Sequence, residues 1–111
     1  MDILGHITTK AAWKSAQKFG EYRAPSLEEE GFIHCSRPDQ LLAVANNFYR
    51  EQKDLVVLWI APNQVDVEIR WEDVEGVQFP HIYGAVNLDA VVMVSDLLSD
   101  KEVFFRDVPN I

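Results

Sequence analysis

The sequence is poor in the residues that would supply disulfides, a basic surface or a membrane span. A single cysteine, Cys35, among 111 residues excludes an intramolecular disulfide. Ten lysines and arginines stand against 18 aspartates and glutamates, and the net charge of -8 argues against binding to DNA or to an anionic membrane surface. No apolar run approaches the length of a transmembrane helix.

The amino-terminal stretch also lacks the pattern of a secretory signal. Residues 1–6 contain no basic segment, and no apolar stretch of signal-peptide type follows them. We therefore expect a cytoplasmic protein. Apolar residues make up 48% of the chain and charged residues 25%, which is typical of a soluble globular protein and predicts one domain over residues 1–111.

Hydrophobic periodicity predicts an α+β fold with helices early in the chain and strands late. The expected helices are residues 10–19, a single turn capped by Ser26, and a segment that runs from a cap at Ser36 to Tyr49 with Phe48 in its buried stripe. Strands are expected at residues 2–8, 31–36, 55–60, 65–72, 79–84, 91–94 and 104–105. The unbroken apolar run at residues 55–60 predicts a central strand that is buried on both faces.

Residues 31–36 (Gly-Phe-Ile-His-Cys-Ser) form the most informative stretch of the chain. Because side chains alternate along a strand, Phe32, His34 and Ser36 are expected on one face. Cys35 falls on the opposite face, which predicts a buried, unreactive thiol rather than a nucleophile paired with His34. A histidine and a hydroxyl thus lie together where a strand leads into a helix, a common position for binding and catalytic residues.

Each of the three histidines is followed two residues later by a hydroxyl residue. The pairs are His6 with Thr8, His34 with Ser36, and His81 with Tyr83. Because residues i and i+2 share a face of a strand, each pair places an imidazole beside a hydroxyl, and three such pairs are expected to line one polar cleft. The alternative is that each ring separately satisfies a buried hydrogen bond.

Two further residues are candidates for this cleft, each with an ordinary alternative. Glu72 is suited to orient a histidine ring or to act as a base, or else it is a surface acid of an acidic protein. Arg23 either clamps a phosphate or carboxylate or remains on the surface. Three histidines can also hold zinc, but these come from separate strands without the usual close spacing, so no metal site is predicted.

Several motifs resemble those of a small bacterial family of unknown function, DUF952. The motifs are residues 31–36, Gln40, Trp71-Glu72 and residues 79–84 (Phe-Pro-His-Ile-Tyr-Gly), and the similarity spans essentially the whole chain. This family is similar in fold to the ADP-ribosyltransferase superfamily, which includes RNA 2'-phosphotransferases. The resemblance implies a split, bent, mixed or antiparallel sheet with two or three short helices, around a cleft that binds NAD in relatives.

Carried over by position, the resemblance also implies roles for the histidines. His6 resembles the superfamily's first-motif histidine, which contacts the nicotinamide ribose, and His34 lies in the strand of the second motif. His81 and Tyr83 fall where many transferases have a catalytic glutamate. No glutamate stands in residues 79–84, so the resemblance supports a cleft more directly than it supports transferase chemistry.

Three functions fit these observations. The first is a module that binds a nucleotide-like or other anionic small molecule, with NAD as a candidate cofactor, and the missing glutamate favours it. The second is an ADP-ribosyl- or RNA 2'-phosphotransferase-type enzyme, and the third is an interaction domain without a ligand. The candidate catalytic residues are His34, His81 and Glu72. The candidate ligand-binding residues are His6, Thr8, Arg23, Ser36 and Tyr83.

Overall fold

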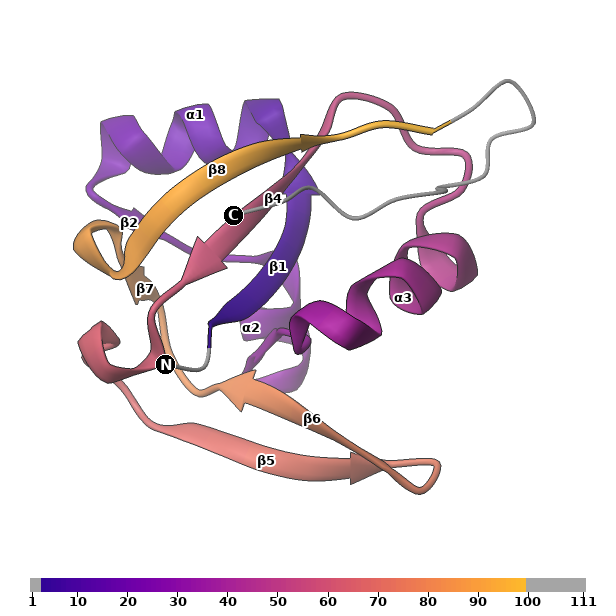
Figure 1. Cartoon of the computed structure of the whole chain (residues 1–111). Helices are drawn as coiled ribbons and strands as arrows, with labels where there is room; N and C mark the ends of the chain where they lie inside the picture. The colour runs from indigo at the N-terminus through magenta and orange to yellow at the C-terminus, as the bar shows by residue number, and fades with distance from the viewer. Residues whose placement is uncertain (1–2, 100–111) are drawn as a thin grey trace.

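A computed structural model describes residues 3–99, which form three antiparallel sheets and three α-helices (Figure 1). The strands are β1 (Leu4–Thr9), β2 (Glu21–Tyr22), β3 (Ile33–His34), β4 (Leu55–Ile60), β5 (Ile69–Val74), β6 (Val77–Ile82), β7 (Val86–Asn87) and β8 (Val91–Leu97). The helices are α1 (Lys10–Phe19), α2 (Pro25–Glu30) and α3 (Leu41–Phe48). The sheets have the strand orders β1-β4-β8, β2-β7 and β3-β6-β5. Every strand pair among these residues is antiparallel, so the α+β class is confirmed and no mixed sheet is present in this part of the chain.

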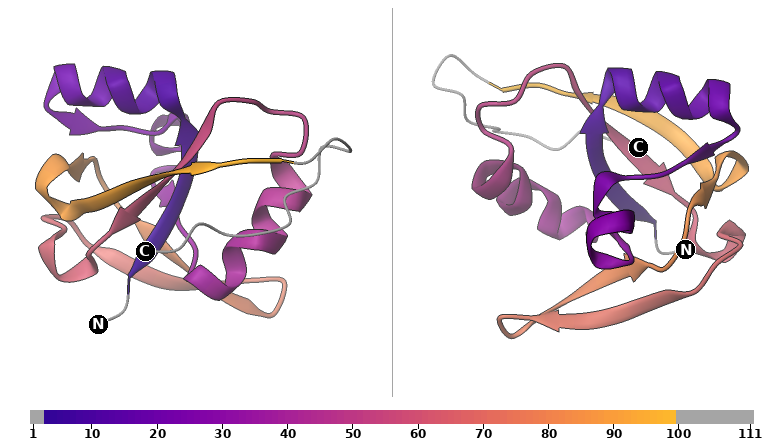
Figure 2. Two further views of the ribbon diagram at one scale, coloured as in Figure 1. Left: turned by 45° about the horizontal axis from the view of Figure 1, so that its top comes forward. Right: turned by 180° about the vertical axis from the view of Figure 1, so that it is seen from behind.

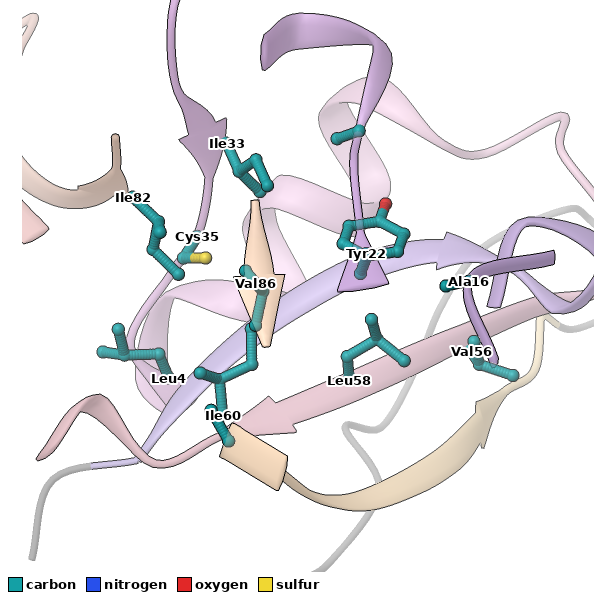
Figure 3. Packing of buried hydrophobic residues seen from close by; sticks show 12 residues of the cluster. Leu4, Ala16, Tyr22, Ile33, Cys35, Val56, Leu58, Ile60, Ile82 and Val86 are labelled. Atoms are coloured by element: carbon teal, nitrogen blue, oxygen red, sulfur yellow. The ribbon is translucent and has the colours of Figure 1, made fainter. Parts of the chain in front are cut away.

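β4 is the centre of the first sheet and is buried along its whole length. Its even-numbered side chains face the larger core cluster, which also contains residues of β1, β3, β6 and β7 (Figure 3). Its odd-numbered side chains face a second cluster, which includes Leu41 and Ala45 of α3. The prediction of a strand buried on both faces is therefore confirmed, and it explains why β4 has no polar position.

α1 begins and ends at the residues that the sequence predicts. The Thr9 hydroxyl accepts a hydrogen bond from the backbone N–H of Ala12 at 3.0 Å, which caps the first turn. Gly20 ends the helix with a φ of 104°, a left-handed conformation that favours glycine. Ala16 and Trp13 pack from α1 into the larger core cluster, so the helix covers one face of the first sheet.

Three local predictions on the helices were wrong. α2 begins at Pro25, whose fixed φ suits the first helical position, and the helix has no side-chain cap, so the capping box expected at Ser26 is absent. α3 begins at Leu41 after a short 3-10 turn, later than the cap expected at Ser36. Phe48 shares a helix face with Leu41 but is 72% exposed, because it is the last residue of α3 and lies outside the core cluster that contains Leu41.

β5 and β6 form a hairpin with a tighter turn than the loop expected around Gly76. The turn consists of Glu75 and Gly76, which both have positive φ, at 51° and 86°. Two consecutive positive φ values are the mark of a type I′ turn, whose twist matches that of the strands. β5 begins at Ile69, so residues 65–68 precede it rather than belong to it. The strand expected at residues 104–105 lies outside the described residues.

The segment that contains β3 connects two of the sheets. β3 pairs with β6, with His34 opposite His81. Two residues later, Ser36 forms an isolated antiparallel bridge with Gly5 of β1, through two backbone hydrogen bonds of 2.8 and 2.9 Å. The chain thus changes its partner strand within three residues, and the hairpin of β5 and β6 lies apart from the first sheet (Figure 2).

Gly5 allows α3 to approach β1 closely. A Cβ atom at this position would lie 2.4 Å from Cδ1 of Leu41, a side chain that is only 2% exposed. We expect Gly5→Ala to lower the free energy of unfolding by about 1–3 kcal/mol, because the side chain overpacks a filled core. Urea denaturation measures the loss. In a Leu41→Ala background the same substitution should cost much less, and an equal cost in both backgrounds would contradict the steric explanation.

Candidate functional site

One face of the β3-β6-β5 sheet carries most of the candidate residues. His34 lies opposite His81 in the strand register, and Glu72 is the diagonal neighbour of His81 on β5. The opposite face is core, where Ile33 and Cys35 are buried. The predicted alternation of side chains along this segment is therefore present, and the predicted burial of Cys35 is confirmed. Burial also raises the pKa of the Cys35 thiol, which lowers its fraction of reactive thiolate.

A cavity of about 420 Å³ opens beside this face, between the hairpin and the carboxyl-terminal end of α3. Its lining residues are His34, Cys35, Ser36, Val44, Phe48, Tyr49, Gln52, Val74, Phe79 and His81. Most of the wall is apolar, and the described lining residues include no arginine or lysine. His34, Ser36 and His81 bring candidate polar groups to this wall, whereas Glu72 and Tyr83 are not among its lining residues.

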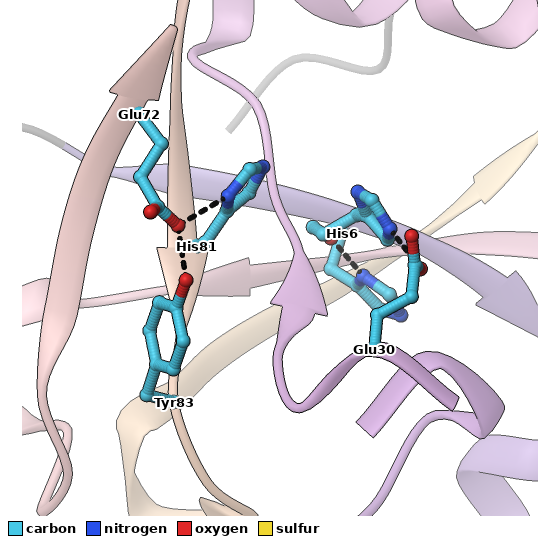
Figure 4. Close-up of polar contacts among 6 residues, drawn as sticks. His6, Glu30, Glu72, His81 and Tyr83 are labelled. Atoms are coloured by element: carbon cyan, nitrogen blue, oxygen red, sulfur yellow. Dashed lines mark hydrogen bonds and ion pairs between the residues drawn. The ribbon is translucent and has the colours of Figure 1, made fainter. Parts of the chain in front are cut away.

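Glu72, His81 and Tyr83 form a hydrogen-bonded cluster (Figure 4). Glu72 Oε1 accepts hydrogen bonds from the Tyr83 hydroxyl and from His81 Nδ1, the latter at 2.9 Å. The bond from Tyr83 and then that from His81 hold the pKa of Glu72 below its usual value, and the same contact raises the pKa of Tyr83. The Arg70 guanidinium lies 4.4 Å from the centre of the Tyr83 ring. The carboxylate is therefore ionised and held in place by two donors.

The two cavity histidines meet edge to face. The ring centroids of His34 and His81 are 5.3 Å apart, with an interplanar angle of 77°. His81 is 4% exposed, and the Phe32 ring stacks on it at 4.1 Å. The His34 side chain is 53% exposed, and its Nε2 lies 2.7 Å from a carboxylate oxygen of Glu30. Each histidine thus has its own carboxylate partner.

His6 belongs to a chain of buried hydrogen bonds that runs from the His34 backbone through Tyr22 to Thr8. Its Nδ1 donates to the backbone carbonyl of His34 at 2.5 Å, and its Nε2 lies 2.7 Å from the Tyr22 hydroxyl. Burial lowers the pKa of His6 to about 4, so the ring is neutral at neutral pH. Because Nδ1 carries the proton, Nε2 accepts from Tyr22, whose pKa burial raises to about 12. Thr8 Oγ1, 3.0 Å from the Tyr22 oxygen, completes the chain.

A second cavity of about 340 Å³ adjoins the first. His6, Thr8 and Tyr22 are among its lining residues, and His34 lines both cavities. His6 and Thr8 are therefore separated from the cluster around His81 by His34, so the three histidine–hydroxyl pairs do not line one continuous wall. Within residues 3–99, no group of three or more histidine, cysteine or acidic side chains is placed to hold a metal ion.

Among the described residues, Arg23 lines neither cavity and, unlike Glu72 and Tyr83, does not belong to the hydrogen-bonded cluster of the lining residue His81. Its guanidinium pairs with the Glu21 carboxylate at 3.2 Å on the surface. The physical reason is strand alternation, because Tyr22 points into the core and turns its neighbours outward. The sequence-based interpretation in turn missed Glu30, the last residue of α2, because its approach to His34 depends on the turn at Gly31 between the helix and β3.

Residues 7–94 of the chain match the family described as "Protein of unknown function (DUF952)". The chain belongs to the DUF952 family. The match covers the chain from β1 to β8 and includes both histidine motifs that suggested the family. No curated protein sequence matches the chain significantly. Among residues 3–99, the helices of this DUF952 protein are all too short or too polar to cross a membrane.

Solved structures of another protein share this fold. A crystal structure of protein CC0527 from Caulobacter crescentus matches with a TM-score of 0.86 at 26% identity, over 94% of this chain and 93% of that chain. The solution NMR structure of CC0527 matches with a TM-score of 0.77 at 27% identity, over 90% and 88% of the two chains. The descriptions of these structures state no activity. The matches support the α+β fold and do not show a likeness to ADP-ribosyltransferases.

Proposed function

We propose that this DUF952 protein binds a small molecule of nucleoside or nucleotide size in the larger cavity. The observation that supports the proposal is the position of His34 and His81, each with a carboxylate partner, on the wall of an otherwise apolar cavity. A mostly apolar space of about 300–1,000 Å³ with a few placed polar groups is typical of ligand sites. The volume of about 420 Å³ falls in this range.

The wall favours a ligand with a flat apolar part and a polar edge. Phe79 and Val74 offer apolar contact for a ring such as a nucleobase, and Ser36 and the two histidines offer hydrogen bonds. An anionic group on the ligand would depend on protonated histidines, because the described wall has no permanent cation and the chain carries a net charge of -8. Anion binding should therefore weaken as pH rises, whereas binding of an uncharged nucleoside should not.

A thermal-shift panel of NAD, ADP-ribose, nucleotides, adenosine, zinc and glutathione identifies a ligand. A compound present at a hundred times its dissociation constant stabilises the folded state by about 2.7 kcal/mol. For a compound that binds, calorimetry between about pH 5.5 and 8 should show that His34→Ala and His81→Ala each weaken binding about tenfold or more, because each removes a hydrogen bond. Arg23→Ala is the matched control and should bind normally.

Unchanged affinity in both histidine variants would contradict a site at this cavity. An affinity for ADP-ribose that is independent of pH would contradict the charged-histidine form of the proposal. If no compound of the panel binds at any pH, the interaction-domain reading becomes the better one.

A transferase that uses NAD is the second candidate function, and Glu72 favours it. Although residues 79–84 contain no glutamate, Glu72 contacts both His81 and Tyr83 across the hairpin. A carboxylate is thus near the place that the ADP-ribosyltransferase resemblance assigns to a catalytic glutamate. Release of nicotinamide from NAD by the wild type, and its loss in Glu72→Gln, would support this candidate, and absence of release would exclude it.

The cytoplasmic location expected from the sequence also belongs to the proposal. A buried, protonated Cys35 thiol as the chain's single cysteine suits a reducing compartment. Fractionation of cells that produce the protein tests this, and recovery with the secreted fraction would contradict it.

A further inference from the structure

We infer that His81 acts as a general base toward a hydroxyl or amino group held in the larger cavity, with Glu72 as its positioning residue. The inference rests on the proposed function in one respect, because the bound molecule or a water beside it supplies the proton. It goes further in naming the atom that takes the proton and the chemistry that a ligand must offer.

Glu72 determines which ring nitrogen of His81 carries the hydrogen. Nδ1 lies 2.9 Å from Glu72 Oε1, and an ionised carboxylate can only accept a hydrogen bond. Nδ1 therefore carries the hydrogen of the neutral ring, and Nε2 carries the lone pair. This is the tautomer in which a carboxylate orients a catalytic histidine.

The lone pair on Nε2 of His81 is available to the cavity. His81 lines the cavity while its Nδ1 is turned toward Glu72, and Figure 4 shows the other ring nitrogen on the side away from Glu72. Among the described residues, Glu72 is the hydrogen-bond partner of the His81 ring, and it contacts Nδ1 rather than Nε2. Nε2 is thus the polar atom of His81 that is available to a molecule in the cavity.

Neighbouring side chains hold Glu72 and His81 in fixed positions. Glu72 is fixed by two donors, because the Tyr83 hydroxyl also bonds Oε1. The His81 ring is stacked on Phe32 with an interplanar angle of 22° and is met edge-on by His34. A base needs such a fixed geometry, since proton transfer requires the nitrogen within hydrogen-bond reach of the proton it removes.

The proposed proton transfer runs from a group in the cavity to His81. A proton moves from an O–H or N–H group in the cavity to Nε2, and the oxygen or nitrogen keeps the bonding electron pair and becomes nucleophilic. Nδ1 keeps its own proton, so the ring becomes an imidazolium whose charge faces the Glu72 carboxylate. The other charged or titratable groups around the pair are Arg70, which lies opposite His81 on β5, Tyr83, which follows β6, and His34 with its partner Glu30. Cys35 and Tyr49 line the same cavity.

The tautomer of His81 is a direct test that needs no ligand. Long-range ¹⁵N–¹H NMR of the wild type at about pH 8, where an ordinary histidine is neutral, should show the Nδ1–H form at His81. Glu72→Gln should shift the population toward the Nε2–H form, because the carboxylate that selects Nδ1–H is gone. The matched control is Glu30→Gln, which removes the carboxylate beside His34 and should leave the His81 tautomer unchanged.

The reactivity of the lone pair is a second test. Diethyl pyrocarbonate, which attacks unprotonated histidine nitrogens, should modify His81 in the wild type despite its burial, and several-fold more slowly in Glu72→Gln. His6 should resist the reagent, because both of its nitrogens are hydrogen-bonded in the core. Tyr83→Phe removes one of the two donors that hold Glu72 but keeps the Glu72–His81 contact. It should therefore slow the modification of His81 less than Glu72→Gln does, and it replaces Glu72→Gln as the informative variant if the latter does not fold.

The outcomes separate this inference from the proposed function. An Nε2–H tautomer at His81 in the wild type, or a His81 as resistant to the reagent as His6, overturns the base assignment even if a ligand of the panel binds. An Nδ1–H tautomer with a reactive Nε2 supports the assignment, and it does so even if every compound of the panel fails to bind and the ligand proposal falls.

Discussion

Replacing Trp59 with alanine is expected to lower the free energy of unfolding by about 3–5 kcal/mol. Trp59 is the last but one residue of β4 and is 1% exposed. Its side chain fills the cluster between the first sheet and α3, so its removal leaves a cavity that neighbours cannot fill without strain. The substitution also deprives the Ser95 hydroxyl of the indole N–H that donates to it at 3.1 Å.

Trp71 provides a matched control for this substitution. It has the same side chain on β5 but is 45% exposed, so Trp71→Ala should cost about 1 kcal/mol or less. Urea denaturation followed by circular dichroism measures both variants without relying on tryptophan fluorescence. Equal losses for the two substitutions would mean that β4 is not the buried centre of the fold.

Acidification from pH 6.5 to 4 is expected to remove about 3 kcal/mol of stability through His6 alone. Burial is the largest cause of the low pKa of this ring, about 4 against an ordinary 6.5, and the bond to the His34 carbonyl partly opposes it. The unfolded chain takes up a proton at this position below pH 6.5, whereas the folded chain does so only near pH 4. The contribution of His6 is therefore fully present above pH 6.5 and is lost as pH falls toward 4.

His6→Asn isolates this effect. The asparagine amide can donate to the His34 carbonyl but does not titrate, so the variant should lose about 3 kcal/mol less than the wild type between pH 6.5 and 4. Carboxylates that titrate in the same range are common to both proteins and cancel in the comparison. Chemical denaturation at a series of pH values gives the two curves, and parallel curves would show that His6 is not a buried neutral ring.

The alternation of side chains in a strand accounts for what the sequence predicts well. It separates Ile33 and Cys35 from His34 on the two faces of one segment, and it identifies β4 as buried on both sides. Strand register, which brings His34 opposite His81, depends on contacts between distant segments. From the sequence, only the shared histidine–hydroxyl pattern and the family resemblance suggested that these two residues meet.

The periodicity of the sequence could not predict features that depend on contacts with distant residues. Phe48 continues the apolar stripe of α3, but it is the last residue of the helix and lies outside the core cluster. Arg23 carries a charge suited to a phosphate, yet the neighbouring Tyr22 decides which way the strand faces. The role of Glu72 follows only from the hairpin register, which places it diagonally across from His81.

The change of partner strand between His34 and Ser36 has a consequence for how the protein assembles. The first sheet's β1–β4 pairing and the β5–β6 hairpin can each form from their own residues, but this segment is placed only when it meets both β6 and Gly5. Each of these contacts joins residues that are far apart in the sequence, so each costs loop-closure entropy. A substitution that breaks either contact is therefore expected to disturb the cavity while β1–β4 and the hairpin remain paired, because His34, Cys35 and Ser36 lie on the cavity wall.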